Sequence, residues 1–314
     1  MRVLITDDCH PILASRLVEA GFEVVTDATL DADSLLSIVS DFDALVVRSK
    51  ISIDARFLDS CGSRLRCIGR LGAGMETIDV SYAEAKGIRC LNSPEGNRDA
   101  VGEHATALLL SLFDRINLAD AEVRQGLWRR EANRGIEVKG KTVGIIGFGN
   151  MGAAFAQRLR GFECHIVAYD KYKAHYAPSY VEEVSLSELQ QRADVVSLHV
   201  PLTEETHYLV DEQFISAMAK PFFLINTARG AVVHTATLAE ALSSGKVMGA
   251  GLDVVEYENM AKDGLDIAQL PADFRYLLQC PCVVLTPHVG GWTVESKYKL
   301  AAVMADKIIT LLNN

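Results

Sequence analysis

Three polar segments of this 314-residue chain each follow an apolar run, and together they carry groups that could bind and reduce a small acid. Arg229 follows Leu-Ile-Asn-Thr-Ala, Glu256 and Glu258 follow Gly-Leu-Asp-Val-Val, and His288 lies in Thr-Pro-His-Val-Gly-Gly. An imidazole donates and accepts a proton near neutral pH, and a guanidinium matches a carboxylate with a fork of donors. Taken singly, Arg229 is also typical of a surface turn, Glu256 and Glu258 of a solvated acidic run, and His288 of a capped strand end.

A glycine-rich segment, Gly147-x-Gly149-x-x-Gly152, follows an apolar run and opens a helical stretch. Gly147 permits a tight turn, Gly149 lets the backbone approach a pyrophosphate, and Gly152 lets the helix pack against the strand. The backbone N–H groups at the helix start, where Asn150 and Met151 lie, favour phosphate binding. The segment therefore predicts a dinucleotide site.

An acid follows the glycines at the spacing that a ribose contact needs. Asp170 lies 21 positions after Gly149 (170 − 149), close to the ~20 typical of this motif. A carboxylate there accepts hydrogen bonds from both ribose hydroxyls and repels a 2′-phosphate. The acid predicts NAD rather than NADP, a preference that the neighbouring Lys171 weakens.

Apolar runs alternate with helical stretches along the chain, as in parallel α/β proteins. In open sheets of this type, ligands bind beyond the carboxyl ends of the strands, so the polar segments above are expected on the ligand side. We expect an α/β fold with two Rossmann-like domains whose parallel sheets flank a cleft. The expected strands are Val3–Ile5, Phe22–Val25, Ala44–Val47, Leu65–Gly69, Ile88–Leu91, Thr142–Ile146, Ile166–Tyr169, Val195–Leu198, Phe222–Ile225, Gly249–Leu252 and Val283–Leu285.

A turn-rich loop at Pro94–Asp99 leads into an apolar stretch, Ala100–Leu118, which we expect to be one long connecting helix. The substrate-binding domain would be discontinuous (1–97 and 289–314), with 98–288 forming the NAD-binding domain. The part Ala105–Phe113 is too short to cross a bilayer. It would pair with its copy in a homodimer, or else be buried within one chain. His104 on this helix is expected to pack and hydrogen-bond rather than to catalyse.

The order of these motifs (GxGxxG, Asp, N-T-A-R-G, G-L-D-V-x-E-x-E, T-P-H-x-G-G) resembles the D-isomer-specific 2-hydroxyacid dehydrogenase family over essentially the whole chain. The resemblance implies hydride transfer between NAD and a D-2-hydroxy acid, with Arg229, Glu258 and His288 as the catalytic residues. His288 would be the acid and base, Glu258 would orient it, and Arg229 would bind the substrate carboxylate. In the family a proline usually follows the second acid, whereas Asn259 stands here, so Glu256 stays an alternative to Glu258.

The resemblance also implies further contacts with the nucleotide. Asp253 would hydrogen-bond the nicotinamide carboxamide. The stretch His199–Pro201 resembles the strand end that flanks the cofactor, where backbone shape matters more than the ring. The other residues expected at the nucleotide are Thr227, Ala228, Gly290 and Gly291.

The segment around Arg48 and Ser49 resembles the one with which phosphoglycerate dehydrogenases of this family meet their substrate. The loop Gly72, Ala73 and Gly74 would hold the substrate carboxylate through its N–H groups, and Asn97 would lie near the substrate. Because arginines suit a phosphate, we expect oxidation of 3-phosphoglycerate to 3-phosphohydroxypyruvate, the entry step to serine. Three more arginines lie near Trp128 and could reach a neighbouring subunit's site: Arg129, Arg130 and Arg134.

Other 2-keto acids, glyoxylate and hydroxypyruvate among them, stay open as substrates. Trp292, which follows the paired glycines, is bulkier than the small residue expected there and could reshape the pocket. We expect no C-terminal regulatory domain and no serine feedback through one. An alternative from another class is an NAD(H)-sensing binding protein, like the C-terminal binding protein corepressors that share this architecture.

The composition limits the partners. The formal net charge of −10, from 31 basic and 41 acidic residues, argues against nucleic acid. The short apolar N-terminus is followed at once by acids and is typical of neither a signal peptide nor a membrane span. Seven irregularly spaced cysteines predict reduced thiols, no metal site and a cytoplasmic location.

Overall fold

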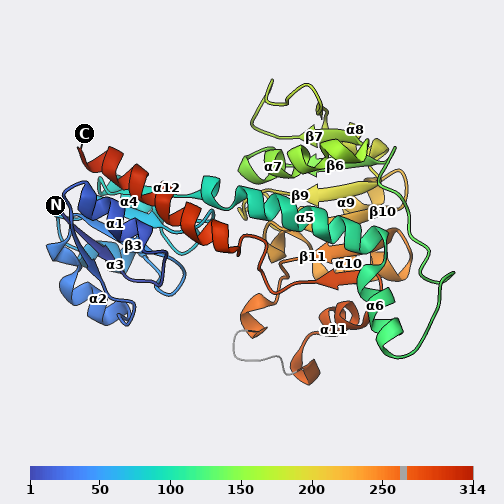
Figure 1. Cartoon of the computed structure of the whole chain (residues 1–314), viewed down its shortest axis with the longest axis horizontal. Coiled ribbons are helices and arrows are strands. Elements are labelled where there is room, and N and C mark those ends of the chain that lie inside the picture. Colours follow the sequence, from blue (N-terminus) through green and yellow to red (C-terminus); the bar gives the residue numbers. More distant parts are fainter. Residues whose placement is uncertain (262–266, 314) are drawn as a thin grey trace. The chain divides into compact units, whose positions relative to one another are not determined.

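A computed structural model describes residues 1–261 and 267–313, apart from the side chains of Asn259 and Ala261. The chain divides into two compact units, Met1–Arg98 with Trp292–Asn314 and Asp99–Gly291. Each unit contains one parallel sheet with helices on both faces (Figure 1).

Unit 1 is a five-stranded parallel sheet in the order β2-β1-β3-β4-β5. Its strands are β1 (Arg2–Ile5), β2 (Glu23–Thr26), β3 (Ala44–Val47), β4 (Cys67–Arg70) and β5 (Arg89–Asn92). Its helices are α1 (Ile12–Glu19), α2 (Ala32–Ile38), α3 (Ala55–Ser60), α4 (Val80–Ala85) and α12 (Val294–Asn313), with 3-10 turns at Val39–Asp41 and Pro94–Gly96.

Alternate residues of the unit 1 strands fill two separate cores. Leu4 and Leu45 pack with residues of α2 and α3 on one face, whereas Val3 and Ile5 pack with α1 and α12 on the other. Both faces are covered, which explains why the central strands β1 and β3 are almost entirely apolar rather than alternately polar. The C-terminal helix α12 is therefore part of the core of unit 1.

Unit 2 is a seven-stranded parallel sheet in the order β12-β11-β10-β9-β6-β7-β8. Its strands are β6 (Thr142–Ile146), β7 (His165–Tyr169), β8 (Glu182–Glu183), β9 (Val195–Leu198), β10 (Phe222–Asn226), β11 (Val247–Leu252) and β12 (Val283–Leu285). The strand order reverses between β6 and β9. Strands β7 and β8 follow on one side of β6, whereas β10, β11 and β12 follow on the far side of β9. A reversal of this kind is where open α/β sheets bind ligands.

The sheet of unit 2 lies between two helical layers with separate cores, one that includes α5 and α7 and another that includes α8 to α11. The helices are α5 (Arg98–Phe113), α6 (Ile116–Arg124), α7 (Asn150–Leu159), α8 (Leu186–Arg192), α9 (Glu212–Ala217), α10 (Thr235–Ser243) and α11 (Ala272–Gln279). Short 3-10 turns lie at Arg160–Phe162, Gly230–Val232, Glu258–Ala261 and Ile267–Gln269.

The single helix expected over Ala100–Leu118 is wrong. The chain breaks between α5 and α6 at Arg115, whose φ of 52° lies in the left-handed region and ends the first helix. Leu108, Leu109 and Phe113 are buried within unit 2, and the Phe113 ring lies 4.9 Å from that of Phe223. The most apolar face of α5 is thus buried within its own chain.

Across the described ranges, no helix combines the length and the apolar character that spanning a bilayer requires. All seven cysteines lie in the described part of the chain and carry free thiols.

Candidate active site

The carboxyl edge of the unit 2 sheet collects the polar residues that the sequence singled out there. The turns after β6, β7, β10, β11 and β12 carry them, and parallel neighbours end at the same edge of a sheet. In chain order they are Gly147, Asp170, Arg229, Asp253 and His288.

Two of the three glycines in the turn after β6 lie where any side chain would collide. At Gly152 an added Cβ would lie 2.1 Å from the Gly147 carbonyl oxygen, so α7 can pack this close only without a side chain. Gly147 has a φ of 89°, and a Cβ there would meet the His199 carbonyl oxygen at 2.6 Å. A Cβ at Gly149 would meet nothing within 4 Å, which leaves open space at the start of α7. The turn therefore fits a pyrophosphate at a helix N-terminus.

Asp170 follows β7 and faces the glycine turn. One carboxylate oxygen accepts the Phe148 N–H at 2.9 Å, and the other accepts the Tyr172 N–H at 3.1 Å. Each oxygen keeps a lone pair that could accept a ribose hydroxyl. Lys171, which the sequence weighed against NAD, is paired with Glu205 instead.

A buried amide shapes the turn that carries Arg229. Asn226 is 1% exposed, donates from Nδ2 to the Arg229 carbonyl oxygen at 2.9 Å, and accepts the Ala228 N–H at 3.0 Å. Gly230 then passes so close to the next segment that a Cβ would lie 2.0 Å from the Val255 carbonyl oxygen. Sequence reasoning quoted Asn226 within its motif but gave it no role, although a buried amide between a strand and an arginine was a usable signal.

The turn after β11 meets the turn after β12 through two side chains. The Nδ1 atom of His288 lies 2.8 Å from Oε2 of Glu258, whose other carboxylate oxygen accepts the Val255 N–H at 3.1 Å. This hydrogen bond to Glu258 is the main reason why the pKa of His288 is raised above its ordinary value. Burial and the positive Arg229 guanidinium oppose the shift. The ring therefore carries a proton at a higher pH than a free histidine.

The choice between the two acids of this segment follows from their partners. Glu256 accepts hydrogen bonds from the Tyr208 hydroxyl and, at 3.2 Å, from the Thr235 N–H. The carboxylate that lies beside His288 is that of Glu258. The substitution of the expected proline by Asn259 leaves this pairing in place; the Asn259 side chain lies outside the described part of the structure.

Asp253 is 3% exposed and holds the turn that carries His288. Its carboxylate accepts the N–H groups of Val289 and Gly290, both at 2.8 Å, and the Thr286 hydroxyl at 2.6 Å. Burial raises the pKa of Asp253, but these hydrogen bonds and that from His104 outweigh burial and hold it below the ordinary value. The carboxylate is therefore charged, and its oxygens accept hydrogen bonds from the turn that carries His288.

Other residues expected at the nucleotide lie at the same edge of the sheet. The Thr227 hydroxyl and Nδ1 of His199 are buried without a hydrogen-bond partner among the described residues. Burial lowers the pKa of His199 to about 3, so this ring is neutral. Asn150 and Met151 form the start of α7, Pro201 follows β9, Ala228 lies in the turn after β10, and Gly290 and Gly291 follow His288.

Unit 1 places its candidate substrate residues at the carboxyl ends of three of its strands. Arg48 and Ser49 follow β3, the loop Gly72, Ala73 and Gly74 follows β4, and Asn97 comes after β5. The Asn92 amide fixes this loop by donating to the Ala73 carbonyl oxygen at 2.7 Å. Oδ1 of Asn97 is buried without a partner in the described chain.

Arg48 is stacked on Trp292. The centre of its guanidinium lies 3.8 Å from the centre of a Trp292 ring, within the range of a cation–π interaction. Burial lowers the pKa of Arg48, and the nearby Asp7 and Asp8 oppose that shift. Among the described residues no acceptor takes a hydrogen bond from this guanidinium, so its N–H groups are available to an anion.

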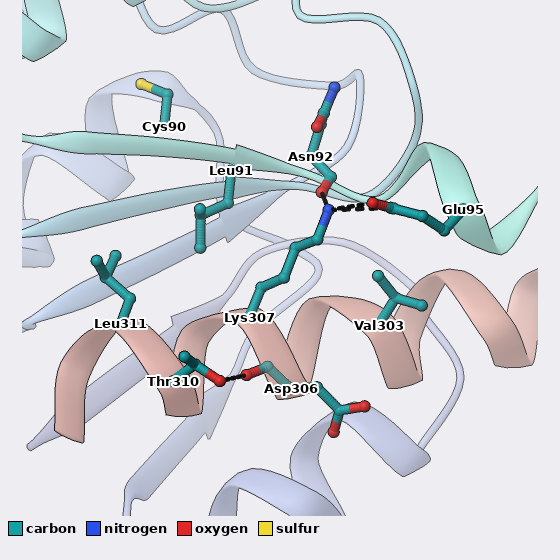
Figure 2. A pocket seen from close by; sticks show the side chains of 9 residues that line it. All are labelled: Cys90, Leu91, Asn92, Glu95, Val303, Asp306, Lys307, Thr310 and Leu311. Carbon is teal, nitrogen blue, oxygen red and sulfur yellow. Dashed lines mark hydrogen bonds and ion pairs between the residues drawn. The ribbon is translucent and has the colours of Figure 1, made fainter. Parts of the chain in front are cut away.

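A hollow of about 690 Å³ in unit 1 includes in its lining Asn92, whose amide holds the loop at Ala73 (Figure 2). It lies between β5 and α12, and its single lysine, Lys307, is bound to Glu95 and to the Asn92 carbonyl oxygen, each at 2.9 Å. None of the candidate site residues lines it.

The fold and the unit 2 site define a class of protein: two Rossmann-like units, one with a dinucleotide-binding turn and a histidine–carboxylate pair at the same sheet edge. Comparison with known proteins identifies the family. Residues 106–290 match the NAD binding domain of the D-isomer specific 2-hydroxyacid dehydrogenases.

Similar proteins agree with that match. The chain is 38% identical over 286 residues to hydroxypyruvate reductase of Thermotoga maritima, covering 90% of this chain and 89% of that protein. It is 36% identical over 308 residues to D-3-phosphoglycerate dehydrogenase of Mycobacterium tuberculosis, covering 98% of this chain but 56% of that protein. The chain thus spans about half the length of the phosphoglycerate dehydrogenases that it matches.

A solved structure, the TT0316 protein of Thermus thermophilus, superimposes with a TM-score of 0.82 at 33% identity, covering 100% of this chain and 97% of that one. The chain belongs to the D-isomer-specific 2-hydroxyacid dehydrogenase family.

Proposed function

We propose that this protein transfers a hydride between NAD and a D-2-hydroxy acid. The observation that carries the proposal is the 2.8 Å contact between Nδ1 of His288 and Oε2 of Glu258. A histidine whose pKa is raised by a carboxylate is a proton donor suited to reducing a ketone and, after losing its proton, a base suited to the reverse reaction. Because Glu258 occupies Nδ1, the proton would be exchanged at Nε2.

The remaining steps follow from the other residues of the site. Arg229 would bind the substrate carboxylate and polarise the adjacent carbonyl group. Its main chain is fixed by Asn226, which supports a defined position for the guanidinium. Glu258 would keep the imidazole in one orientation and stabilise its charged form.

The cofactor would be held by unit 2. Gly147, Gly149 and Gly152 leave room for the pyrophosphate at the start of α7, and Asp170 would accept the ribose hydroxyls, which favours NAD over NADP. When bound, NAD supplies or accepts the hydride at its nicotinamide ring. The Thr227 hydroxyl, which is buried without a partner among the described residues, is a further group that would bind the nucleotide.

Unit 1 would bind the substrate, and 3-phosphoglycerate is our leading candidate. Arg48 offers a phosphate or a second carboxylate N–H donors that no described residue uses, and the loop at Gly72–Gly74 would bind the substrate carboxylate. Similarity to a hydroxypyruvate reductase over nearly its whole length supports a second candidate, hydroxypyruvate or glyoxylate. The two candidates differ in whether Arg48 meets an anionic group.

A substrate panel tests these proposals. Loss of NADH absorbance would be followed after separate addition of 3-phosphohydroxypyruvate, hydroxypyruvate, glyoxylate and pyruvate. We expect the highest kcat/KM with 3-phosphohydroxypyruvate and no measurable turnover by His288→Gln, which should still bind NADH. Turnover of none of the four, together with tight NADH binding by the unmodified protein, would instead favour an NAD(H)-sensing binding protein.

We also propose that the protein is a cytoplasmic homodimer. No residue of helix α6 is fully buried, and Trp128 just after it is 78% exposed. Val123 and Ile136 are about half exposed, and together with Trp128 we take them as the apolar surface that a second copy would cover. Light scattering should give twice the chain mass for the unmodified protein and the single mass for Val123→Glu/Trp128→Glu; a monomeric unmodified protein would refute the dimer.

A further inference from the structure

His104 makes contacts that the roles considered so far do not use. It lies on α5, with its side chain 20% exposed. Its Nε2 atom lies 2.9 Å from the Thr286 hydroxyl and 3.2 Å from Oδ1 of Asp253. Asp253 lies in the turn after β11, and Thr286 lies in the turn after β12, which also carries His288. One ring nitrogen of His104 therefore connects α5 to both turns.

The hydrogen bonds determine that Nε2 of His104 carries a proton. The Thr286 hydroxyl has a single proton, which it donates to Oδ1 of Asp253 at 2.6 Å. The oxygen of Thr286 can then only accept a hydrogen bond from His104. The Nε2 atom of His104 therefore carries a proton and donates to both Thr286 and Asp253.

The turn held by this cluster has an unfavourable backbone. His288 has a φ of 56°, in the left-handed region that residues other than glycine seldom adopt. Its N–H donates to the Asp253 carbonyl oxygen at 2.8 Å, and the next two N–H groups donate to the Asp253 carboxylate. Such a conformation persists only when its surroundings determine it. The orientation of Asp253 therefore sets that of the His288 main chain.

We propose that His104 is a positioning residue for His288, acting through Asp253 and Thr286. By donating from Nε2, it holds the Asp253 carboxylate toward the turn and so keeps the His288 imidazole against Glu258. The catalytic meaning of this role rests on the function proposed above, but the contact that it maintains does not.

The imidazole of His288 reports directly on this arrangement. The charged groups that influence it are Glu258, Asp253 and Arg229. Its raised pKa depends mainly on the hydrogen bond to Glu258, so a turn that moves His288 away should lower that pKa. Histidine-labelled protein followed by NMR gives the value without any substrate, and the resonance is assigned by its loss in His288→Gln.

Two substitutions at His104 separate positioning from simple packing. His104→Phe fills the same space without a donor, whereas His104→Gln keeps an N–H donor. We expect His104→Phe to lower the His288 pKa toward its ordinary value and to reduce kcat about tenfold or more, since small misplacement of a catalytic group is costly. His104→Gln should restore most of both.

Thr286→Val, which removes the hydroxyl, provides a second route to the same effect and should also lower the His288 pKa. The proposal is overturned if His104→Phe leaves the His288 pKa unchanged, or if His104→Gln and His104→Phe lower it equally. If His104→Phe does not fold, Thr286→Val decides by the same pKa measurement. Absence of turnover with every keto acid would count against the proposed function alone.

Discussion

The imidazole of His288 and the carboxylate of Glu258, thirty residues apart in sequence, form a hydrogen bond of 2.8 Å. Each comes from a turn after a different strand, β12 and β11, and these strands are neighbours in the sheet. The pairing depends on the close parallel contact of β11 and β12 and on the Asp253 carboxylate that holds the second turn.

Replacing Glu258 by glutamine should shift the pH profile of the reaction. Without the carboxylate, the pKa of His288 falls, so the fraction of enzyme that carries the proton for keto-acid reduction falls at neutral pH. We expect kcat for reduction at pH 7 to drop about tenfold or more, and the alkaline limb of the profile to move to lower pH. Glu256→Gln is the matched control and should leave that limb unchanged; an equal shift in both variants would contradict the assignment of Glu258.

The same pair predicts a small dependence of stability on pH. The pKa of His288 is higher in the folded than in the unfolded protein, so the stabilisation is fully present below the unfolded pKa and is lost as the pH rises through the folded pKa. Since the His288 side chain is half exposed, solvent limits the effect to about 0.5 kcal/mol. Denaturant unfolding should show Glu258→Gln less stable than the unmodified protein at pH 5.5 and equal to it at pH 9. A gap that widens with pH would mean the opposite sign of the pKa shift.

Arg229→Lys tests the carboxylate-binding role. A lysine keeps the charge but loses the fork of donors, and a hydrogen bond to a charged group contributes about 1.5–3 kcal/mol. We expect kcat/KM for the keto acid to fall about tenfold to a hundredfold. The Kd of NADH, measured by fluorescence titration, should change less than twofold, because the arginine is not expected to hold the nucleotide. Loss of NADH binding to the same extent would place Arg229 at the cofactor instead.

Two glycines of the nucleotide turn should respond differently to the same added methyl group. Gly152→Ala places a Cβ 2.1 Å from the Gly147 carbonyl oxygen, so α7 must move and we expect a loss of about 2 kcal/mol in the free energy of unfolding. Gly149→Ala meets nothing within 4 Å and should keep its stability. It should raise the Kd of NADH about tenfold, since its methyl group fills the space for the pyrophosphate. Unaltered NADH affinity in a folded Gly149→Ala would move the nucleotide away from this turn.

Both sheets and the polar turns could be predicted from the sequence, because the buried strands of a parallel sheet are mostly apolar. Neighbouring parallel strands also end at the same edge of the sheet. His288 and Arg229 could be predicted together from the order of the motifs. The choice of Glu258 over Glu256 depends on which acid the 3-10 turn after β11 directs toward His288, and two acids two residues apart do not reveal that.

The sequence was misleading where an apolar pattern has two structural solutions. Ala100–Leu118 has no feature that separates one long helix from two, and the break at Arg115 requires a left-handed arginine that no local signal predicts. Six of the α-helices that the structure describes were not predicted, and two of them, α3 and α4, have only six residues, which give little periodicity. The others are α8, α9, α10 and α11. The connection of His104 to Asp253 is a contact across 149 residues (253 − 104) and can be seen only in three dimensions.

Trp292 offers the sharpest test of the substrate class. Its indole covers one face of the Arg48 guanidinium at 3.8 Å and limits the positions that the side chain can adopt. Trp292→Ala removes the ring, so the Arg48 side chain can adopt more conformations. We expect its binding of an anionic group to weaken by about 1 kcal/mol, the size of a cation–π interaction. We expect KM for 3-phosphohydroxypyruvate to rise about fivefold and KM for glyoxylate, which has no second anionic group, to change less than twofold. Trp292→Phe keeps an aromatic face and should restore most of the affinity. The proposal is contradicted if both KM values rise alike or if only the KM for glyoxylate rises. Arg48 would then not bind a second anionic group, and a smaller keto acid would replace the phosphorylated compound as the candidate substrate.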